Sequence, residues 1–130
     1  MSGVYVDTSA LGRVLCREPD GPAVVRALAE FDLHVASRLL RVELRRLALR
    51  QDVLQAAGEL LAAIALVPVD QATLDDAETV PPASVATLDA IHLATAVRLS
   101  AAGVIDTLMT YDARLAVGAA HHGLAVLAPT

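Results

Sequence analysis

The chain has 130 residues, a formal net charge of −5 and a hydrophobic content of 55%, so we expect residues 1–130 to form a single domain with a substantial core. All 10 basic residues are arginine, and the lack of lysine excludes a P-loop phosphate site and Schiff-base chemistry. The single cysteine, Cys16, excludes a disulfide within the chain and a multi-cysteine zinc site.

Short apolar runs alternate with helical patterns along the whole chain. In chain order we expect a strand at 4–6, helices at 10–17 and 22–30, a strand at 33–36, helices at 38–50 and 53–63, a strand at 65–69, helices at 71–79 and 88–100, a strand at 107–110, a helix at 113–121 and a strand at 124–127. Strands that alternate with helices predict an α/β fold in three layers, with a five-stranded parallel sheet flanked by helices.

Polar residues with short side chains mark the starts of several of these helices. We expect Ser37, Asp52, Asp70 and Asp112 to cap the helices that follow them, and Thr87 to open the helix at 88–100. The sequence has no leader-like N-terminal segment and no apolar span of about 18 residues, so we expect a cytoplasmic protein with no membrane partner.

Four acidic residues are the strongest candidates for a functional site: Asp7, Glu43, Asp89 and Asp112. Asp7 and Asp112 follow apolar strand-like runs, and the carboxyl ends of parallel strands are where α/β sheets bind ligands. Carboxylates that gather at one edge repel each other, so they favour a bound cation. Ligation by oxygen alone suits Mg²⁺, with Mn²⁺ as a possible substitute. The sequence therefore predicts a metal-dependent phosphodiesterase.

Each of these acids also has a simpler interpretation. Asp7 and Asp112 are placed to cap helices, and Asp89 lies in the first turn of a helix, where its dipole favours an acid. Glu43 has Arg46 three residues further along the helix, so an ordinary ion pair would also explain it.

A second group of residues has supporting roles that the sequence leaves open. Ser9 and Thr110 are candidates to orient the carboxylates, and both are equally suited to capping. His92 shares a helix face with Asp89, where a packing role is favoured over that of a general base. The dense arginines of the third expected helix are suited to phosphate contact, to a solvated face or to an oligomer interface: Arg38, Arg41, Arg45, Arg46 and Arg50.

The sequence resembles the PIN-domain nucleases, and within them the VapC-type toxins of type II toxin–antitoxin modules. The resemblance rests on Val-Asp-Thr-Ser-Ala-Leu at 6–11, Val-Glu-Leu at 42–44, Leu-Asp-Ala-Ile-His-Leu-Ala-Thr-Ala at 88–96, and Thr-Tyr-Asp-Ala-Arg-Leu at 110–115. It spans nearly the whole chain, and the order and spacing of all four acids agree with it.

The resemblance implies a five-stranded PIN-like fold, a Mg²⁺ site formed by the four acids, and an endoribonuclease that hydrolyses RNA with metal-activated water. It also implies a co-encoded antitoxin as partner and self-association into a homodimer. A catalytically silent PIN-like module that binds RNA or protein is the alternative, and a carboxylate–metal site does not by itself distinguish RNA from DNA. The chain has few aromatic residues that could stack on bases, so the sequence does not identify an RNA target.

Overall fold

The computed structural model describes residues 2–130. Its elements are β1 (Gly3–Val6), α1 (Thr8–Leu15), α2 (Gly21–Leu28), β2 (Leu33–Ser37), α3 (Leu39–Gln51), α4 (Leu54–Leu61), β3 (Ala65–Val67), α5 (Gln71–Ala77), α6 (Thr87–Ala101), β4 (Thr107–Met109), α7 (Ala113–His121) and β5 (Ala125–Leu127).

Five parallel strands form one sheet in the order β3-β2-β1-β4-β5. The central strand β1 pairs with β2 on one side, where Val4 lies opposite His34, and with β4 on the other, where Val4 lies opposite Thr107. The chain builds outward from β1 to β3 and then returns to place β4 on the other side of β1. The strand order therefore reverses between β1 and β4, and such a reversal is where open α/β sheets bind ligands.

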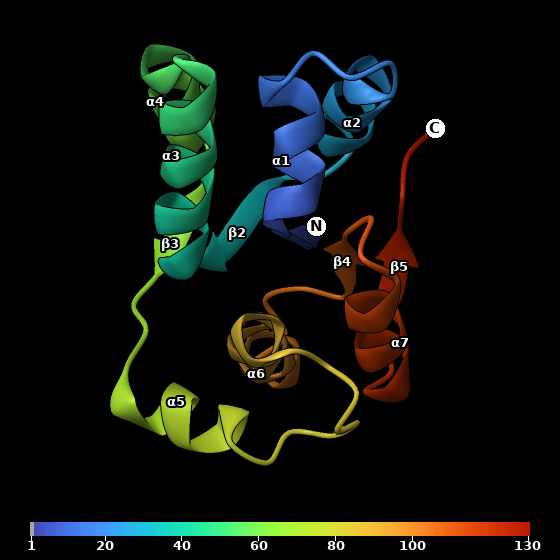
Figure 1. Ribbon diagram of the computed structural model, residues 1–130. Helices are drawn as coiled ribbons and strands as arrows, with labels where there is room; N and C mark the ends of the chain where they lie inside the picture. Colours follow the sequence, from blue (N-terminus) through green and yellow to red (C-terminus); the bar gives the residue numbers. More distant parts are fainter. Residues whose placement is uncertain (1) are drawn as a thin grey trace.

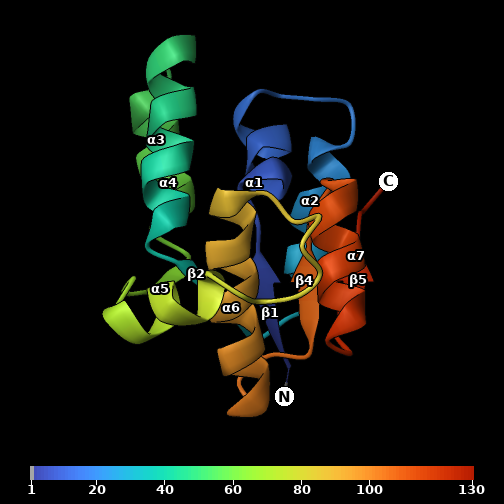
Figure 2. The same cartoon turned by 60° about the horizontal axis from the view of Figure 1, so that its bottom comes forward.

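Helices cover both faces of the sheet, which confirms the predicted three-layer α/β fold. Helices α1, α2, α3 and α4 lie above the sheet in Figure 1, whereas α5 and α6 lie below it. Figure 2 shows α6 and α7 in front of β1 and β4. This arrangement buries both faces, so the central strand is apolar along its length: Val4, Tyr5 and Val6 are all fully buried.

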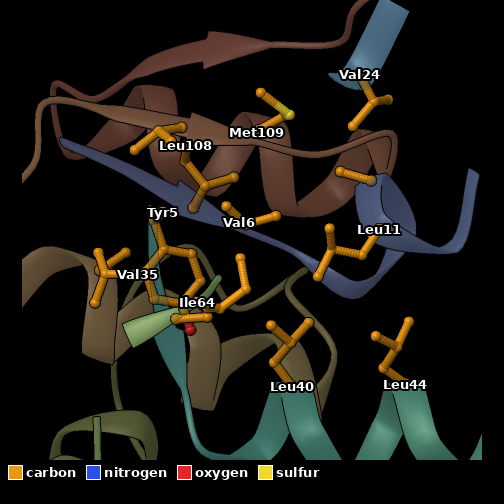
Figure 3. Close-up of a cluster of buried hydrophobic side chains, with 14 of the residues drawn as sticks. Tyr5, Val6, Leu11, Val24, Val35, Leu40, Leu44, Ile64, Leu108 and Met109 are labelled. Carbon is orange, nitrogen blue, oxygen red and sulfur yellow. The ribbon is translucent and has the colours of Figure 1, made fainter. Parts of the chain in front are cut away.

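The core is built from aliphatic side chains. Leu40 and Leu44 point from α3 toward β1, as predicted from their helical spacing, and both are fully buried (Figure 3). Tyr5 is the one ring in the strand β1, and it packs in the same cluster as Val35. Side chains alternate between the faces of a strand, so Tyr5 and Asp7 point the same way from β1.

The expected element boundaries needed correction at two caps and in several lengths. Arg38, not Ser37, is the cap position of α3, although the Ser37 hydroxyl accepts the backbone N–H of Leu39 at 3.1 Å. Asp52 does not cap α4 as predicted: it ends α3 with a left-handed backbone (φ 56°), and Val53 precedes α4. Asp tolerates this conformation better than most residues, which makes it suitable for the tight link between the two helices. Asp70 and Asp112 do cap α5 and α7, as predicted. Thr110 lies just beyond the end of β4, and its hydroxyl donates to Asp7.

None of the helices within residues 2–130 combines the length and the apolar character needed to cross a bilayer.

Two glycines provide a matched test of the packing around β1. A Cβ atom at Gly3 would lie 2.3 Å from the carbonyl oxygen of Val104, whereas one at Gly58 in α4 would meet no atom within 4 Å. We expect Gly3→Ala to lower the free energy of unfolding by about 1–3 kcal/mol, because the backbone must shift. Gly58→Ala should raise it by roughly 0.5–1 kcal/mol through helix propensity. Urea unfolding measures both, and equal effects of the two changes would contradict the close approach at Gly3.

Candidate functional site

The acidic residues collect around the point where the strand order reverses. Asp7 directly follows β1, and Asp112 lies three residues beyond the end of the neighbouring β4. The backbone N–H of Asp7 donates to the carbonyl of Met109 at 3.0 Å, which joins the ends of the two strands. Both carboxylates therefore lie at the carboxyl edge of the sheet, as predicted.

Asp7 is the most buried of the four acids, with only 4% of its surface exposed. Its Oδ2 atom accepts hydrogen bonds from the hydroxyls of Ser9 at 2.7 Å and Thr110 at 2.8 Å, and a longer one from the Ser9 amide at 3.4 Å. The two hydroxyl oxygens in turn accept the backbone N–H groups of Tyr111 at 2.9 Å and Asp112 at 3.0 Å. Ser9 and Thr110 thus orient Asp7, which was one of their two predicted roles.

Glu43 comes from α3, and its side chain is 23% exposed. One oxygen, Oε1, accepts hydrogen bonds from the Thr8 hydroxyl at 2.8 Å and from Nε2 of His92 at 2.6 Å. Burial acts to raise the pKa of Glu43, but the contacts with His92 and Thr8 outweigh it and hold this pKa below its ordinary value. Glu43 is therefore ionised, and its partner is His92 rather than the Arg46 that the helix spacing suggested.

His92 is fully buried in α6 and has a second partner in β1. Its Nδ1 atom lies 2.6 Å from the hydroxyl of Tyr5, and that hydroxyl also accepts the backbone N–H of Ser37 at 3.0 Å. Burial, the largest cause, raises the pKa of Tyr5, so the phenol keeps its proton. Tyr5 was not among the site residues predicted from the sequence. The available signal was its position two residues before Asp7, on the same face of the strand.

Asp89 and Asp112 are both half-buried. Burial, followed by the charges of Asp7 and Asp112, raises the pKa of Asp89 to about 6. The charge of Glu43 adds to this effect, and His92 opposes it. Asp112 also caps α7, because its Oδ1 accepts the amide of Leu115 at 2.8 Å. The four acids are thus near enough to influence each other electrostatically.

The side chains are not arranged as a closed metal site. Within residues 2–130, no three His, Cys, Asp or Glu side chains stand close enough together to hold one metal ion. The donors at this edge are nevertheless carboxylate and hydroxyl oxygens, the types that hard divalent cations prefer. The Asp7 bonds described above use Oδ2 and the Glu43 bonds use Oε1, so each acid has a second oxygen outside these contacts.

The arginines of α3 form a basic surface on its outer side. A shallow depression of about 450 Å³ there is lined by Arg38, Arg41, Val42, Arg45, Arg46, Leu49 and Leu54. Val42 and Leu49 are about half exposed, at 51% and 54%, so the surface mixes positive charge with apolar groups.

The fold and the edge together define an α/β protein with a carboxylate site at the reversal of its strand order. The family model described as the PIN domain matches residues 4–127. The chain is also 40% identical to ribonuclease VapC46 of Mycobacterium tuberculosis, with all of both chains covered. Ribonuclease VapC47 of the same species is 32% identical, with 97% of this chain and 96% of the relative covered. The chain therefore belongs to the PIN domain family, in its VapC group.

Solved structures share the fold at low sequence identity. A chain of a toxin–antitoxin complex from Klebsiella pneumoniae is 17% identical, with a TM-score of 0.74 and 98% of each chain covered. VapC20 of Mycobacterium tuberculosis, described as a sarcin–ricin loop cleaving toxin, is 16% identical with a TM-score of 0.67; 88% of this chain and 93% of that one are covered. VapBC2 of Rickettsia felis, solved with a DNA fragment from its promoter, is 12% identical with a TM-score of 0.62; 98% of this chain and 99% of that one are covered.

The raised pKa of Asp89 makes the stability of the metal-free protein depend on pH. The folded state holds this proton up to about pH 6, whereas the unfolded chain releases it near 3.8. The stabilising contribution of the neutral carboxyl is therefore complete below pH 4 and is lost as the pH rises to about 6. We expect Asp89→Asn to raise the free energy of unfolding near neutral pH by about 1–2 kcal/mol, since solvent screening reduces the value that the full pKa shift would give.

Urea unfolding of the metal-free protein at about pH 4 and about pH 7.5 measures this effect. Asp75→Asn, at an exposed position of α5, is the matched control and should leave the pH dependence unchanged. Equal stabilisation by Asp89→Asn at both pH values would contradict the repulsion among the acids.

Proposed function

We propose that this chain is the toxin of a type II toxin–antitoxin module and acts, as one domain, as a Mg²⁺-dependent endoribonuclease. The observation that carries the proposal is the placement of Asp7, Glu43, Asp89 and Asp112 around the reversal of the strand order, in a chain that aligns over its full length with a relative named as a ribonuclease. We propose these four acids as the metal ligands and catalytic residues.

The donor set supports a hard divalent cation, Mg²⁺ or Mn²⁺. The repulsion that raises the pKa of Asp89 would be relieved by a positive charge at this edge. Because the side chains do not converge on one point, binding an ion requires the half-buried Asp89 and Asp112 to turn toward Asp7. Asp89 and Asp112 are only half-buried, whereas Asp7 is buried and held in place by two hydroxyls.

The chain's own residues contribute positioning and charge to phosphodiester hydrolysis. A bound Mg²⁺ would lower the pKa of a water molecule and offset charge on the phosphate. Ser9 and Thr110 fix the orientation of Asp7, and Thr8 does the same for Glu43. The raised pKa of Asp89 lets it exchange a proton near neutral pH in the metal-free state. No protein nucleophile is required in this scheme.

The proposed partners are an RNA substrate, a cognate antitoxin and a second copy of this chain. One of the solved structures that share the fold is a chain of a toxin–antitoxin complex, which supports the antitoxin. The relatives named as ribonucleases support RNA. We place the protein in the cytoplasm, where RNA and a co-encoded antitoxin are both present.

A catalytically silent PIN-like module that binds RNA or protein is the alternative. One observation favours it: the acids of residues 2–130 do not stand in coordinating positions. Retention of all four acids in the order that the family motifs require favours the enzyme, and the following experiment separates the two.

Asp7→Asn should abolish cleavage and leave the fold intact, because one charged ligand is lost while the side-chain volume is kept. We expect the rate of cleavage of single-stranded RNA in the presence of Mg²⁺ or Mn²⁺ to fall by more than about 100-fold. Gel electrophoresis of the RNA products measures this rate. Addition of EDTA to the wild-type protein should stop cleavage in the same way.

Asp75→Asn is the control for loss of an acid that lies away from the site, and it should cut as the wild type does. Undiminished cutting in EDTA would reject the metal-dependent mechanism. A wild-type protein that binds RNA but does not cut it in either metal would favour the silent module.

Expression of the wild-type chain alone should arrest bacterial growth, and co-expression of the cognate antitoxin should reverse the arrest. The physical reason is that the acidic edge can accept a cationic side chain of a partner in place of a metal ion. Growth curves at matched expression measure this. Arrest by a variant that carries both Asp7→Asn and Asp89→Asn would show that toxicity does not arise from these acids.

A further inference from the structure

A chain of hydrogen bonds runs through the protein interior from β2 to Glu43. It begins at the backbone N–H of Ser37, passes through the Tyr5 hydroxyl and the His92 ring, and ends at Oε1 of Glu43, with successive distances of 3.0, 2.6 and 2.6 Å. Its members come from β2, β1, α6 and α3, so it connects four elements that are distant in sequence. Ser37, Tyr5 and His92 are all fully buried.

The two ends of this chain fix the roles of its outer hydrogen bonds. A backbone N–H can only donate, so the Tyr5 oxygen accepts from Ser37. An ionised carboxylate can only accept, so Nε2 of His92 carries a hydrogen and donates it to Glu43. The Tyr5 hydroxyl donates to Nδ1 in the neutral ring and accepts from it in the protonated ring. In both forms, the contact with Tyr5 fixes the orientation of the ring, with the Nε2–H group facing Glu43.

Packing of the core alone does not require this chain of hydrogen bonds. An apolar pair at positions 5 and 92 would fill a core built otherwise from aliphatic residues without placing a phenol and an imidazole away from water. Buried polar groups are favourable only when each finds a partner, and here the Tyr5 hydroxyl and both ring nitrogens of His92 have partners. The arrangement therefore points to an effect on its final member, the partly exposed Glu43.

We propose that Tyr5 and His92 are positioning residues for the metal site: they hold Glu43 with Oε1 turned into the protein, so that Oε2 is the oxygen presented to an ion. This inference rests on the proposed function. Thr8 donates to the same oxygen from α1, which fixes the carboxylate from a second side. Neither Tyr5 nor His92 touches the substrate or the ion in this scheme, and both act through Glu43.

Substitutions at Tyr5 and His92 that preserve packing should differ in whether they preserve the contact with Glu43. Tyr5→Phe removes one oxygen and keeps the aromatic ring, so Nδ1 of His92 loses the hydrogen bond that fixes the orientation of the imidazole. His92→Leu removes the donor to Glu43 altogether. His92→Gln retains an N–H group that can reach the position of Nε2, so it is the conservative variant that should preserve the contact.

The test measures Mn²⁺ binding to the protein in the absence of RNA, by isothermal titration calorimetry. We expect Tyr5→Phe and His92→Leu to raise the Kd for Mn²⁺ by about 10-fold or more, as the loss of such supporting partners does at other metal sites. His92→Gln should lie nearer the wild type than His92→Leu. RNA cleavage by Tyr5→Phe should need more Mn²⁺ for half-maximal rate and recover most of its kcat at saturating Mn²⁺.

Tyr111→Phe is the matched control for loss of a tyrosine hydroxyl. Its hydroxyl donates to the backbone carbonyl of Pro129, away from Glu43, so its removal should leave the Kd for Mn²⁺ within about twofold of the wild type. In Glu43→Gln, the further change Tyr5→Phe should add no more than about twofold to the Kd, because the residue through which Tyr5 acts has already lost its charge.

Three results would decide against the proposal. A wild-type protein that binds no Mn²⁺ would overturn the proposed function and this inference together. If the wild type binds Mn²⁺, and Tyr5→Phe and His92→Leu bind it with the same Kd, this inference alone is overturned and the proposed function stands. A full additional loss from Tyr5→Phe in the Glu43→Gln background would show that Tyr5 does not act through Glu43.

Discussion

The hydroxyls of Ser9 and Thr110 that donate to Asp7 hold the functional edge of the sheet together. Both donate to Oδ2, and they accept backbone amides from the segment that leads from β4 into α7. The same few atoms thus compensate the burial of a carboxylate, join the start of α1 to the turn after β4, and place Asp112 at the start of its helix. Without them, Asp7 would be a buried charge whose carboxylate retains only the long contact with the Ser9 amide, which is a costly state. The position of Asp112 at this edge therefore depends on the same contacts as the position of Asp7.

Glu43 reaches the edge by a different physical route. Asp7 is oriented by Ser9, two positions along the chain, and by Thr110, which directly follows the neighbouring strand. Glu43 is oriented by α6, β1 and α1 together. Helices α3 and α6 lie on opposite sides of the sheet, so the contact between Glu43 and His92 joins the two outer layers beyond the strand ends (Figure 1). A shift of either helix would move the Glu43 carboxylate relative to Asp7. The relative position of these two acids therefore depends on how both helix layers pack against the sheet.

The sequence predicted the strand and helix order and the positions of Asp7 and Asp112, because both follow from local patterns. Strand periodicity locates the carboxyl ends, and parallel pairing brings neighbouring ends together. The partner of Glu43 was not predictable in the same way: helix spacing suggested Arg46, and the actual partner lies 49 residues away. Tyr5 was missed since a tyrosine in a buried strand has the same pattern as any core residue. Asp52 was assigned to the wrong helix, because a residue between two adjacent helices is equally close to the end of one and the start of the next.

The arginines of α3 also divide the charge of the molecule unevenly. Residues 38–50 carry five arginines and one acid, while the rest of the chain carries five arginines and 14 acids. A polyanion would therefore be attracted to residues 38–50 in preference to the more acidic remainder, and so would be oriented before any contact forms. Such orientation acts over about 8–10 Å at physiological salt and fades as salt is added. A chain that is acidic overall can in this way capture a negatively charged molecule in a limited set of orientations, and a uniformly basic surface would bind it in many.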